Sequence, residues 1–151
     1  MTLITGSDLY NQAWMVTYKT ISGNVTDPKG RGSAWIYSDY PVIQQGKADE
    51  HPGFPLITLD DFNTDSEMVT FNEGKRSYDL NSIITIHTDT RKHLDTISSD
   101  ITAAFSVNSA ALAQSGLYAY SLSSGGTDTL VIDRNHKIHT KTVGVGFRVC
   151  I

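Results

Sequence analysis

The histidines carry most of the metal-binding and acid–base potential of this chain. His87 and His93 flank Asp89, and His136 and His139 are three residues apart. Imidazole nitrogens bind Zn²⁺ and exchange protons near neutral pH, so each group is a candidate site. Neither spacing matches a standard metal motif, and two residues three apart in a strand lie on opposite faces of a sheet. We therefore expect no metal and no cofactor.

The sequence contains none of the usual motifs for nucleophilic catalysis. No serine lies in a G-x-S-x-G turn, and we expect the single cysteine, Cys150, to be a small apolar side chain in a buried strand. The glycines Gly23, Gly30 and Gly32 form neither a phosphate-binding loop with its lysine nor a dinucleotide-binding fingerprint. The sequence therefore predicts a protein that is not an enzyme.

Two clusters of side chains remain as candidate contact surfaces. The first is acidic and is either a solvated loop or, in a ring, a lumen-facing loop that repels DNA and lets it slide. The second is aromatic and either contacts a neighbouring subunit or closes over one end of the sheet. The acidic cluster consists of Asp60, Asp61, Asp65, Glu67 and Glu73, and the aromatic cluster of Trp35, Tyr37, Tyr40 and Phe54.

Length and composition indicate one globular domain. The chain has 151 residues, of which 39% are hydrophobic and 19% charged. A net charge of -4 argues against a surface that grips nucleic acid phosphates. No apolar run is long enough to span a membrane, the first eight residues lack a basic leader, and one cysteine excludes an intrachain disulfide. We expect a cytoplasmic product without membrane association.

Hydrophobic periodicity predicts the elements that must position these residues. A first helix opens at Ser7 and ends near Gly23, and a second carries an apolar face at spacings of three and four. Between the first helix and residue 54 only residues 34–37 are strand-like. The first helix has the stripe Tyr10, Trp14, Thr17, Tyr18 and Ile21, and the second has Leu94, Ile97, Ile101, Ala104 and Phe105.

The remaining segments read as strands. Residues 123–126 and 133–136 are predicted turns, and the last strand points alternate apolar residues from Val143 to Ile151 inward. The predicted strands are residues 55–59, 67–71, 78–89, 117–122, 129–132 and 139–151. The sequence thus predicts an α+β fold, with a mixed, mostly antiparallel sheet flanked by two helices. We expect a single domain over residues 1–151, with a long irregular insertion at about 24–54.

Four stretches carry a family resemblance. They are a strand introduced by an aromatic-proline pair, a long strand, a helix and a closing strand at the carboxyl end, at residues 54–59, 78–89, 94–105 and 143–151. With the first helix and the intervening strands they cover about two thirds of the chain. In size and element order the chain resembles the tail terminator, or tail completion, proteins of long-tailed bacteriophages. The insertion at 24–54 departs from that pattern.

The resemblance implies a structural virion protein at the head–tail joint, assembled in the host cytoplasm. Its members form a hexameric ring that caps the tail tube protein, ends tube polymerisation and offers its opposite face to a head-completion or stopper protein. DNA passes through the lumen without specific binding. Two other interpretations remain open: a head–tail connector or stopper subunit, and a small ferredoxin-like enzyme or ligand-binding domain with a site at His87, Asp89 and His93.

Overall fold

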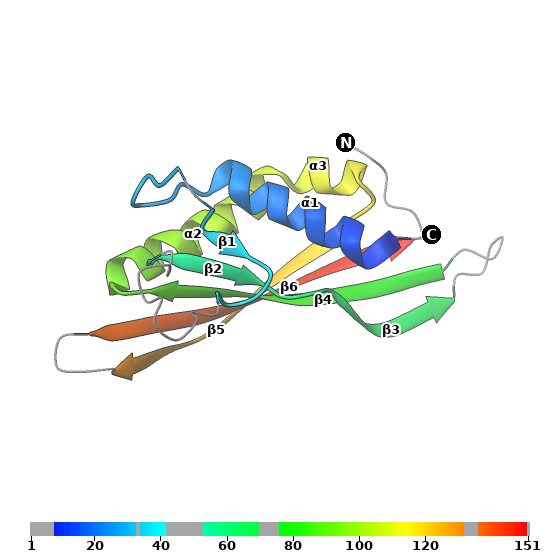
Figure 1. The fold of residues 1–151 in the computed structure, drawn as a ribbon. Helices are drawn as coiled ribbons and strands as arrows, with labels where there is room; N and C mark the ends of the chain where they lie inside the picture. The colour runs from blue at the N-terminus through cyan, green and yellow to red at the C-terminus, as the bar shows by residue number, and fades with distance from the viewer. Residues whose placement is uncertain (1–7, 33, 42–52, 70–75, 132–135, 151) are drawn as a thin grey trace.

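The computed structural model describes residues 8–32, 34–41, 53–69, 76–131 and 136–150. Within these ranges three helices lie on one face of a six-stranded sheet (Figure 1). The predicted α+β fold with a mixed, mostly antiparallel sheet is confirmed, although the second predicted helix is followed by a short third one. The order is α1, β1–β4, α2, α3, β5 and β6.

The sheet places β4 at its centre. The order is β1-β2-β4-β6-β5, and β3 pairs with β4 further along the same side as β2. Only the β1–β2 pair is parallel. The strands are β1 Ile36–Tyr37, β2 Leu56–Leu59, β3 Asn63–Val69, β4 Arg76–Thr88, β5 Tyr118–Val131 and β6 Lys137–Cys150.

Helix α1 spans Leu9–Asn24 and buries a slightly different face from the predicted one. Thr17 and Ile21 are buried as expected, whereas Trp14 and Tyr18 are half-buried and Tyr10 is exposed. Ala13 is fully buried, and its small side chain allows α1 to pack closely on the core. The rings of Trp14 and Tyr18 stack on each other at the edge of this interface, with their centroids 5.3 Å apart. The predicted cap, Ser7, lies outside the described residues.

Helix α2, Arg91–Val107, buries the five residues that its spacing predicts. It begins after Thr90, whose hydroxyl accepts a hydrogen bond from the His93 backbone N–H at 3.4 Å and so satisfies one free amide. After Asn108 the chain restarts as α3, Ser109–Gln114. The core beneath the helices includes a set of three rings, in which Phe147 lies 5.9 Å from Phe62 and 6.0 Å from Phe105 between centroids.

The predicted turn at residues 123–126 is wrong, because β5 runs through it as one strand. β5 has two register shifts against β6, between Tyr118 and Ser121 and between Ser124 and Thr127, and the second of these bulges contains Gly125 and Gly126. Gly125 is required there, since a Cβ would lie 2.2 Å from the Thr142 side-chain oxygen. The predicted turn at 133–136 falls almost wholly outside the described residues.

The last strand alternates as predicted from Val143 to Val149, with one correction, and Ile151 lies outside the described residues. Val143, Val145, Phe147 and Val149 are buried, but Cys150 is exposed, because period-two alternation turns it away from the core. On the helix-free face, Gly144 and Gly146 admit the side chains of the neighbouring strands rather than another backbone. A Cβ on Gly146 would lie 2.8 Å from Ser121 Oγ.

The predicted insertion at 24–54 contributes only β1 to the regular structure that is described. Residues 42–52 of it lie outside the described ranges. None of the helices described is both long and apolar enough to cross a membrane.

Candidate functional site

The three residues of the enzymatic interpretation do not converge. His87 alternates with buried Ile86 and Thr88, so it points to the helix-free face, where its ring lies 5.0 Å from that of Tyr40. Burial there lowers the pKa of His87 below its usual value. Asp89 pairs instead with Lys29, at 3.7 Å between Nζ and Oδ2.

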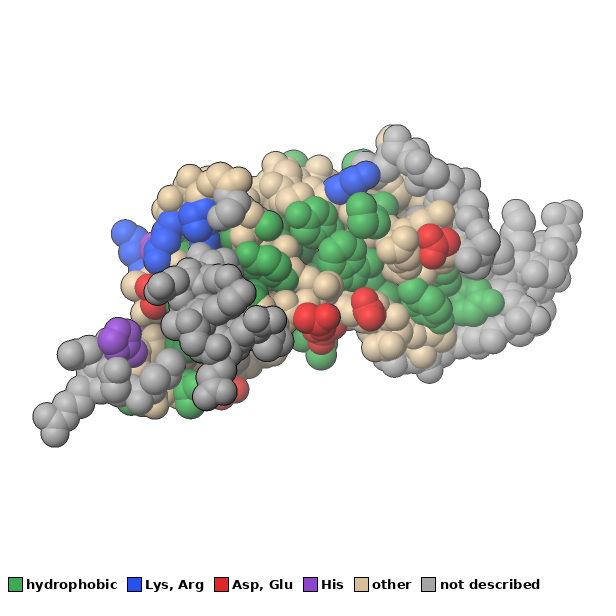
Figure 2. Space-filling model, viewed as in Figure 1, with side chains coloured by type: hydrophobic (Ala, Val, Ile, Leu, Met, Phe, Trp, Pro, Cys, Tyr) green, Lys and Arg blue, Asp and Glu red, His purple; other side chains and the backbone are tan. Residues whose placement is uncertain are grey.

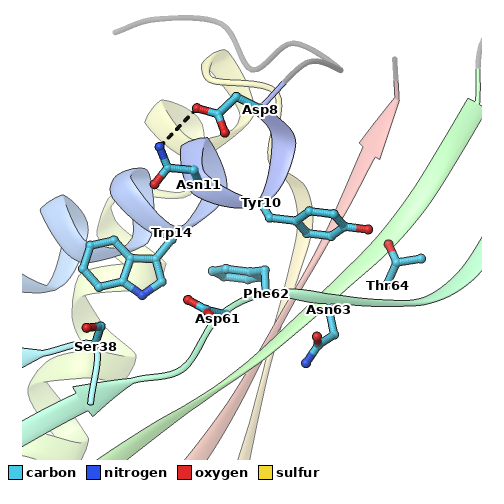
Figure 3. Close-up of a pocket in the computed structure, with 9 residues that line it drawn as sticks. All are labelled: Asp8, Tyr10, Asn11, Trp14, Ser38, Asp61, Phe62, Asn63 and Thr64. Atoms are coloured by element: carbon cyan, nitrogen blue, oxygen red, sulfur yellow. Dashed lines mark hydrogen bonds between the residues drawn. The ribbon is translucent and has the colours of Figure 1, made fainter. Parts of the chain in front are cut away.

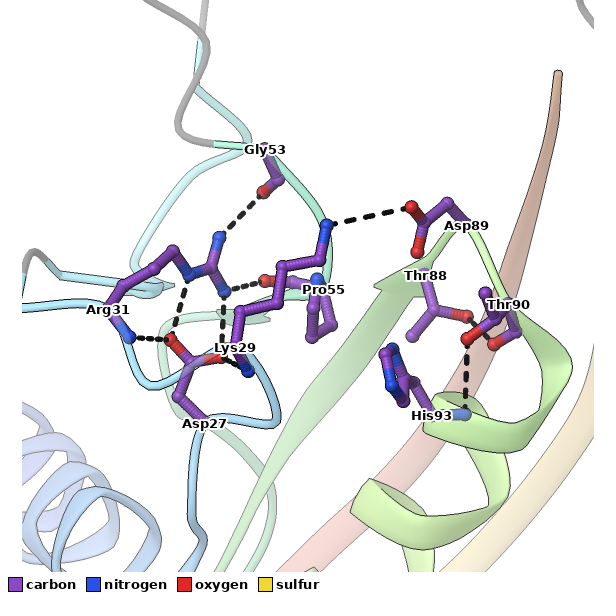
Figure 4. A network of polar contacts seen from close by, with 9 residues as sticks. All are labelled: Asp27, Lys29, Arg31, Gly53, Pro55, Thr88, Asp89, Thr90 and His93. Atoms are coloured by element: carbon purple, nitrogen blue, oxygen red, sulfur yellow. Dashed lines mark hydrogen bonds and ion pairs between the residues drawn. The ribbon is translucent and has the colours of Figure 1, made fainter.

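His93 lies in the first turn of α2, just after Thr90 (Figure 4). His87, Asp89 and His93 do not line any of the surface hollows found between the described residues. His139 Nδ1 lies 2.9 Å from Thr129 Oγ1. In the described ranges, no three His, Cys, Asp or Glu side chains are arranged to hold a metal ion.

The aromatic cluster divides between core and surface. Trp35 belongs to the hydrophobic core, and Tyr37 is half-buried, its hydroxyl donating to the Ala34 carbonyl at 2.6 Å. Phe54 is half-buried before Pro55. Tyr40 is 42% exposed over His87. Trp35 therefore closes over the sheet, and contact of this cluster with another subunit stays a prediction that rests mainly on Tyr40.

The acidic cluster is described only in part. Asp60 and Asp61 are exposed between β2 and β3 and line a hollow of about 230 Å³ together with Ile83. The side chains of Asp65 and Glu67, both on β3, and the whole of Glu73 lie outside what the structure describes. The lumen-facing role of these carboxylates stays a prediction.

An ion pair that the motif search missed fastens the segment after α1 to the start of β2. The carboxylate of Asp27 accepts hydrogen bonds from Arg31 Nε at 2.8 Å and from the Lys29 backbone N–H at 2.9 Å. Arg31 also donates to the carbonyls of Gly53 and Pro55 (Figure 4). The sequence could have indicated this ion pair, because Asp27 and Arg31 are four residues apart in a turn-forming segment that also contains Pro28 and Gly30.

Hydrogen bonding controls the charge of this buried carboxylate. Burial of Asp27 opposes ionisation, but hydrogen bonds from Arg31 and from two backbone N–H groups outweigh it and hold the pKa of Asp27 below its usual value. The side chains of Asp27 and Arg31 are only 7% and 15% exposed. The pair is therefore structural and keeps residues 27–31 against residues 53–55.

A large open hollow lies between the start of α1 and the segment that joins β2 to β3. Its volume is about 930 Å³, and Figure 3 shows Tyr10 extending from α1 toward Thr64 and Trp14 lying beside Asp61, with Phe62 between them. Asp8 adds a second carboxylate, which accepts a hydrogen bond from Asn11 Nδ2 at 3.1 Å. No sequence motif indicated this site, because its residues come from three segments that are distant in the sequence.

Charge is distributed unevenly over this side of the molecule. Hydrophobic side chains gather along its middle with carboxylates beside them, whereas most of the basic side chains gather toward the α2 end (Figure 2). A second hollow, of about 450 Å³, separates α1 from α3 and is lined by Met15, Val16, Lys19 and Leu112 among others. The described residues that line this second hollow include one cationic side chain, Lys19, and no carboxylate.

The edges of the sheet are the remaining candidate surface. Among the described residues, β5 pairs only with β6, so one side of a 14-residue strand carries backbone groups without a strand partner. At the other side of the sheet, β3 pairs only with β4 within the same ranges. Both edges offer hydrogen-bonding groups to another extended chain.

Comparison with known proteins adds no family assignment. No protein-family model matches the chain, and no curated protein matches it.

Proposed function

We propose that this chain is a structural subunit of a bacteriophage tail, of the tail terminator class, that assembles into a ring. The element order supports this: α1, the strand β2 after Phe54 and Pro55, the long β4, α2 and the closing β6. The single observation that carries the proposal is that, within the described ranges, β5 and β3 each have one side without a strand partner, on opposite sides of one subunit.

The edge of β5 carries two bulges but lacks the proline and lysine residues by which monomeric proteins commonly protect such strands. It contains no proline, no lysine and no arginine, and Asp128 is its only charged residue. Leu130 and Val131 leave large apolar side chains exposed at its end. A strand of this length and composition favours pairing with another chain.

Strand directions favour a head-to-tail assembly of identical copies. β3, β4, β6 and β5 follow one another as antiparallel neighbours, so the β3 edge of a second copy in the same orientation would meet β5 antiparallel. A repeated head-to-tail contact generates a ring when the rotation closes. The resemblance implies six copies.

In this proposal the ring caps the tail tube protein, ends its polymerisation and binds a head-completion or stopper protein on its opposite face. The helix-free face presents short polar side chains and glycine, including Asn81, Ser121, Ser123, Gly144 and Gly146. It also carries the exposed guanidinium of Arg148, whose Nε lies 3.0 Å from Asp79 Oδ1 and is thereby paired with a carboxylate. Such a surface, with the carboxylates of Asp60 and Asp61, would let DNA pass without holding its phosphates. The protein would act in the virion after assembly in the host cytoplasm, without catalysing a reaction.

The first test measures the mass of the purified chain by light scattering over a range of concentrations, together with electron-microscope images of the same sample. We expect a ring, and we expect Leu130→Lys to reduce it to monomers by placing a charge at the strand edge. Val107→Lys is the matched control, because Val107 is 80% exposed at the end of α2. A monomer at every concentration, also in the presence of tail tubes, would refute the proposal.

A test of partner binding then distinguishes the tail terminator function from the connector or stopper function. A terminator should bind tube ends and stop their growth in a polymerisation assay. A ring that binds a head-completion protein but leaves tube growth unchanged would instead be a stopper subunit.

A further inference from the structure

The hollow between α1 and the β2–β3 segment combines negative charge with exposed aromatic surface. Asp8 and Asp61 are both exposed at it, Tyr10 is 47% exposed, and Trp14 and Phe62 form part of its wall. None of the residues described as lining it is Lys, Arg or His. The site therefore favours a ligand that is cationic and has a flat or apolar surface.

The aromatic wall is fixed in place before any ligand arrives. The indole N–H of Trp14 donates to the Leu59 carbonyl at 3.0 Å, and the ring stacks on Tyr18. Phe62 is buried and packs against Phe147. A ligand would thus bind without ordering these side chains, which reduces the entropic cost of binding.

A lining residue of the hollow has a buried hydroxyl group without a hydrogen-bond partner. Thr64 Oγ1 is buried and has no hydrogen-bond partner among the described residues. A buried polar atom without a partner costs free energy, so a donor at this wall would be stabilising. Metal ions fit poorly, because no three carboxylate or imidazole groups in the described ranges are arranged around one point.

We propose that this hollow binds the guanidinium group of an arginine side chain presented by a partner protein. A guanidinium is planar and stacks on aromatic rings, and its N–H groups can donate to a carboxylate and a hydroxyl at once. An ammonium group is more strongly hydrated and lacks the flat surface. The proposal does not depend on ring formation, since all the residues that carry it belong to one subunit.

The test titrates the 151-residue chain at low salt with N-acetyl-argininamide and follows the two indole N–H signals by NMR. Trp14 and Trp35 are the only tryptophans, and buried Trp35 serves as the internal reference. We expect a saturable shift of the Trp14 signal alone. N-acetyl-citrullinamide, which has the same shape without the charge, should bind at least about fivefold more weakly. N-acetyl-lysinamide should also bind more weakly.

Matched variants locate the binding. Asp61→Asn and Tyr10→Ala should each weaken binding about threefold to fivefold, as expected for one exposed charge or one aromatic face. Asp95→Asn on α2 and Met15→Ala on α1 are the controls, since both residues are exposed and neither lines this hollow. Equal shifts with the citrulline probe, equal binding of the lysine probe, or unchanged binding in Asp61→Asn would each overturn the proposal.

Discussion

Replacing Asp27 by alanine tests whether the buried ion pair with Arg31 fixes residues 27–31. The change removes the carboxylate that accepts from Arg31 Nε and from the backbone N–H groups of Lys29 and Arg31, at 2.8, 2.9 and 3.1 Å. It leaves a guanidinium that is only 15% exposed without this counterion. Breaking such a pair from one side leaves a poorly solvated charge, and we expect a loss of ~3 kcal/mol in the free energy of unfolding.

The assay is urea denaturation followed by circular dichroism, at one protein concentration for all variants. The corresponding fall in the melting temperature is about 6–12 °C for a chain of this size. Asp95→Ala is the control, because Asp95 is exposed on α2. A loss below about 1 kcal/mol for Asp27→Ala would show that the pair is effectively solvated, and the reasoning would fail.

The pH dependence of the free energy of unfolding provides a second test of the role of Asp27. The pKa of Asp27 is below 3.8 in the folded protein, so its contribution is fully present above pH 3.8. It is lost as the pH falls through the folded pKa, where the native carboxylate takes up its proton. The difference in stability between the wild type and Asp27→Asn should therefore shrink only in that acidic range.

Three further predictions follow from burial and charge. Phe147→Asp should abolish folding, because it would place a charge among the aromatic rings of Phe62 and Phe105. If circular dichroism showed that this variant is soluble and folded, the core face of β6 would be misassigned. Replacing both Asp60 and Asp61 by lysine should change the melting temperature by no more than about 2 °C, because both side chains are exposed. If the double variant unfolded instead, these carboxylates would be needed for the fold. Burial lowers the pKa of His87 below 6.5, so stability should decline as the pH falls from 6.5 toward the folded pKa, and His87→Gln should flatten that slope in denaturation midpoints.

Periodicity predicted the elements whose burial is one-sided. The apolar spacing of Leu94, Ile97 and Ile101 defined α2, and alternation defined β4 and β6, because each of these elements packs one face against the core. The predicted break in β5 was wrong for the opposite reason. Nearly all of β5 is exposed on both faces, so its side chains carry no pattern, and Gly125 and Gly126 suggested a turn where pairing with β6 continues.

The candidate sites were less predictable than the fold. The acidic and aromatic clusters were chosen by proximity in the sequence, and the structure divides the aromatic one between core and surface. The hollow unites Tyr10 with Phe62, about fifty positions apart, and no local pattern links them. The contact between Arg31 and Gly53 likewise depends on tertiary folding, over a separation of 22 residues.

The two bulges of β5 have a geometric consequence for assembly. At each register shift β5 uses three residue steps where β6 uses two, so the outer strand is longer than the strand it follows and must bend. In the proposed ring, for which the resemblance implies six copies, each copy would have to turn the shared sheet by one sixth of a circle. If copies join along β5, its built-in bend would help to set the angle between neighbours, and the number of subunits would then be encoded in backbone length rather than in side-chain chemistry.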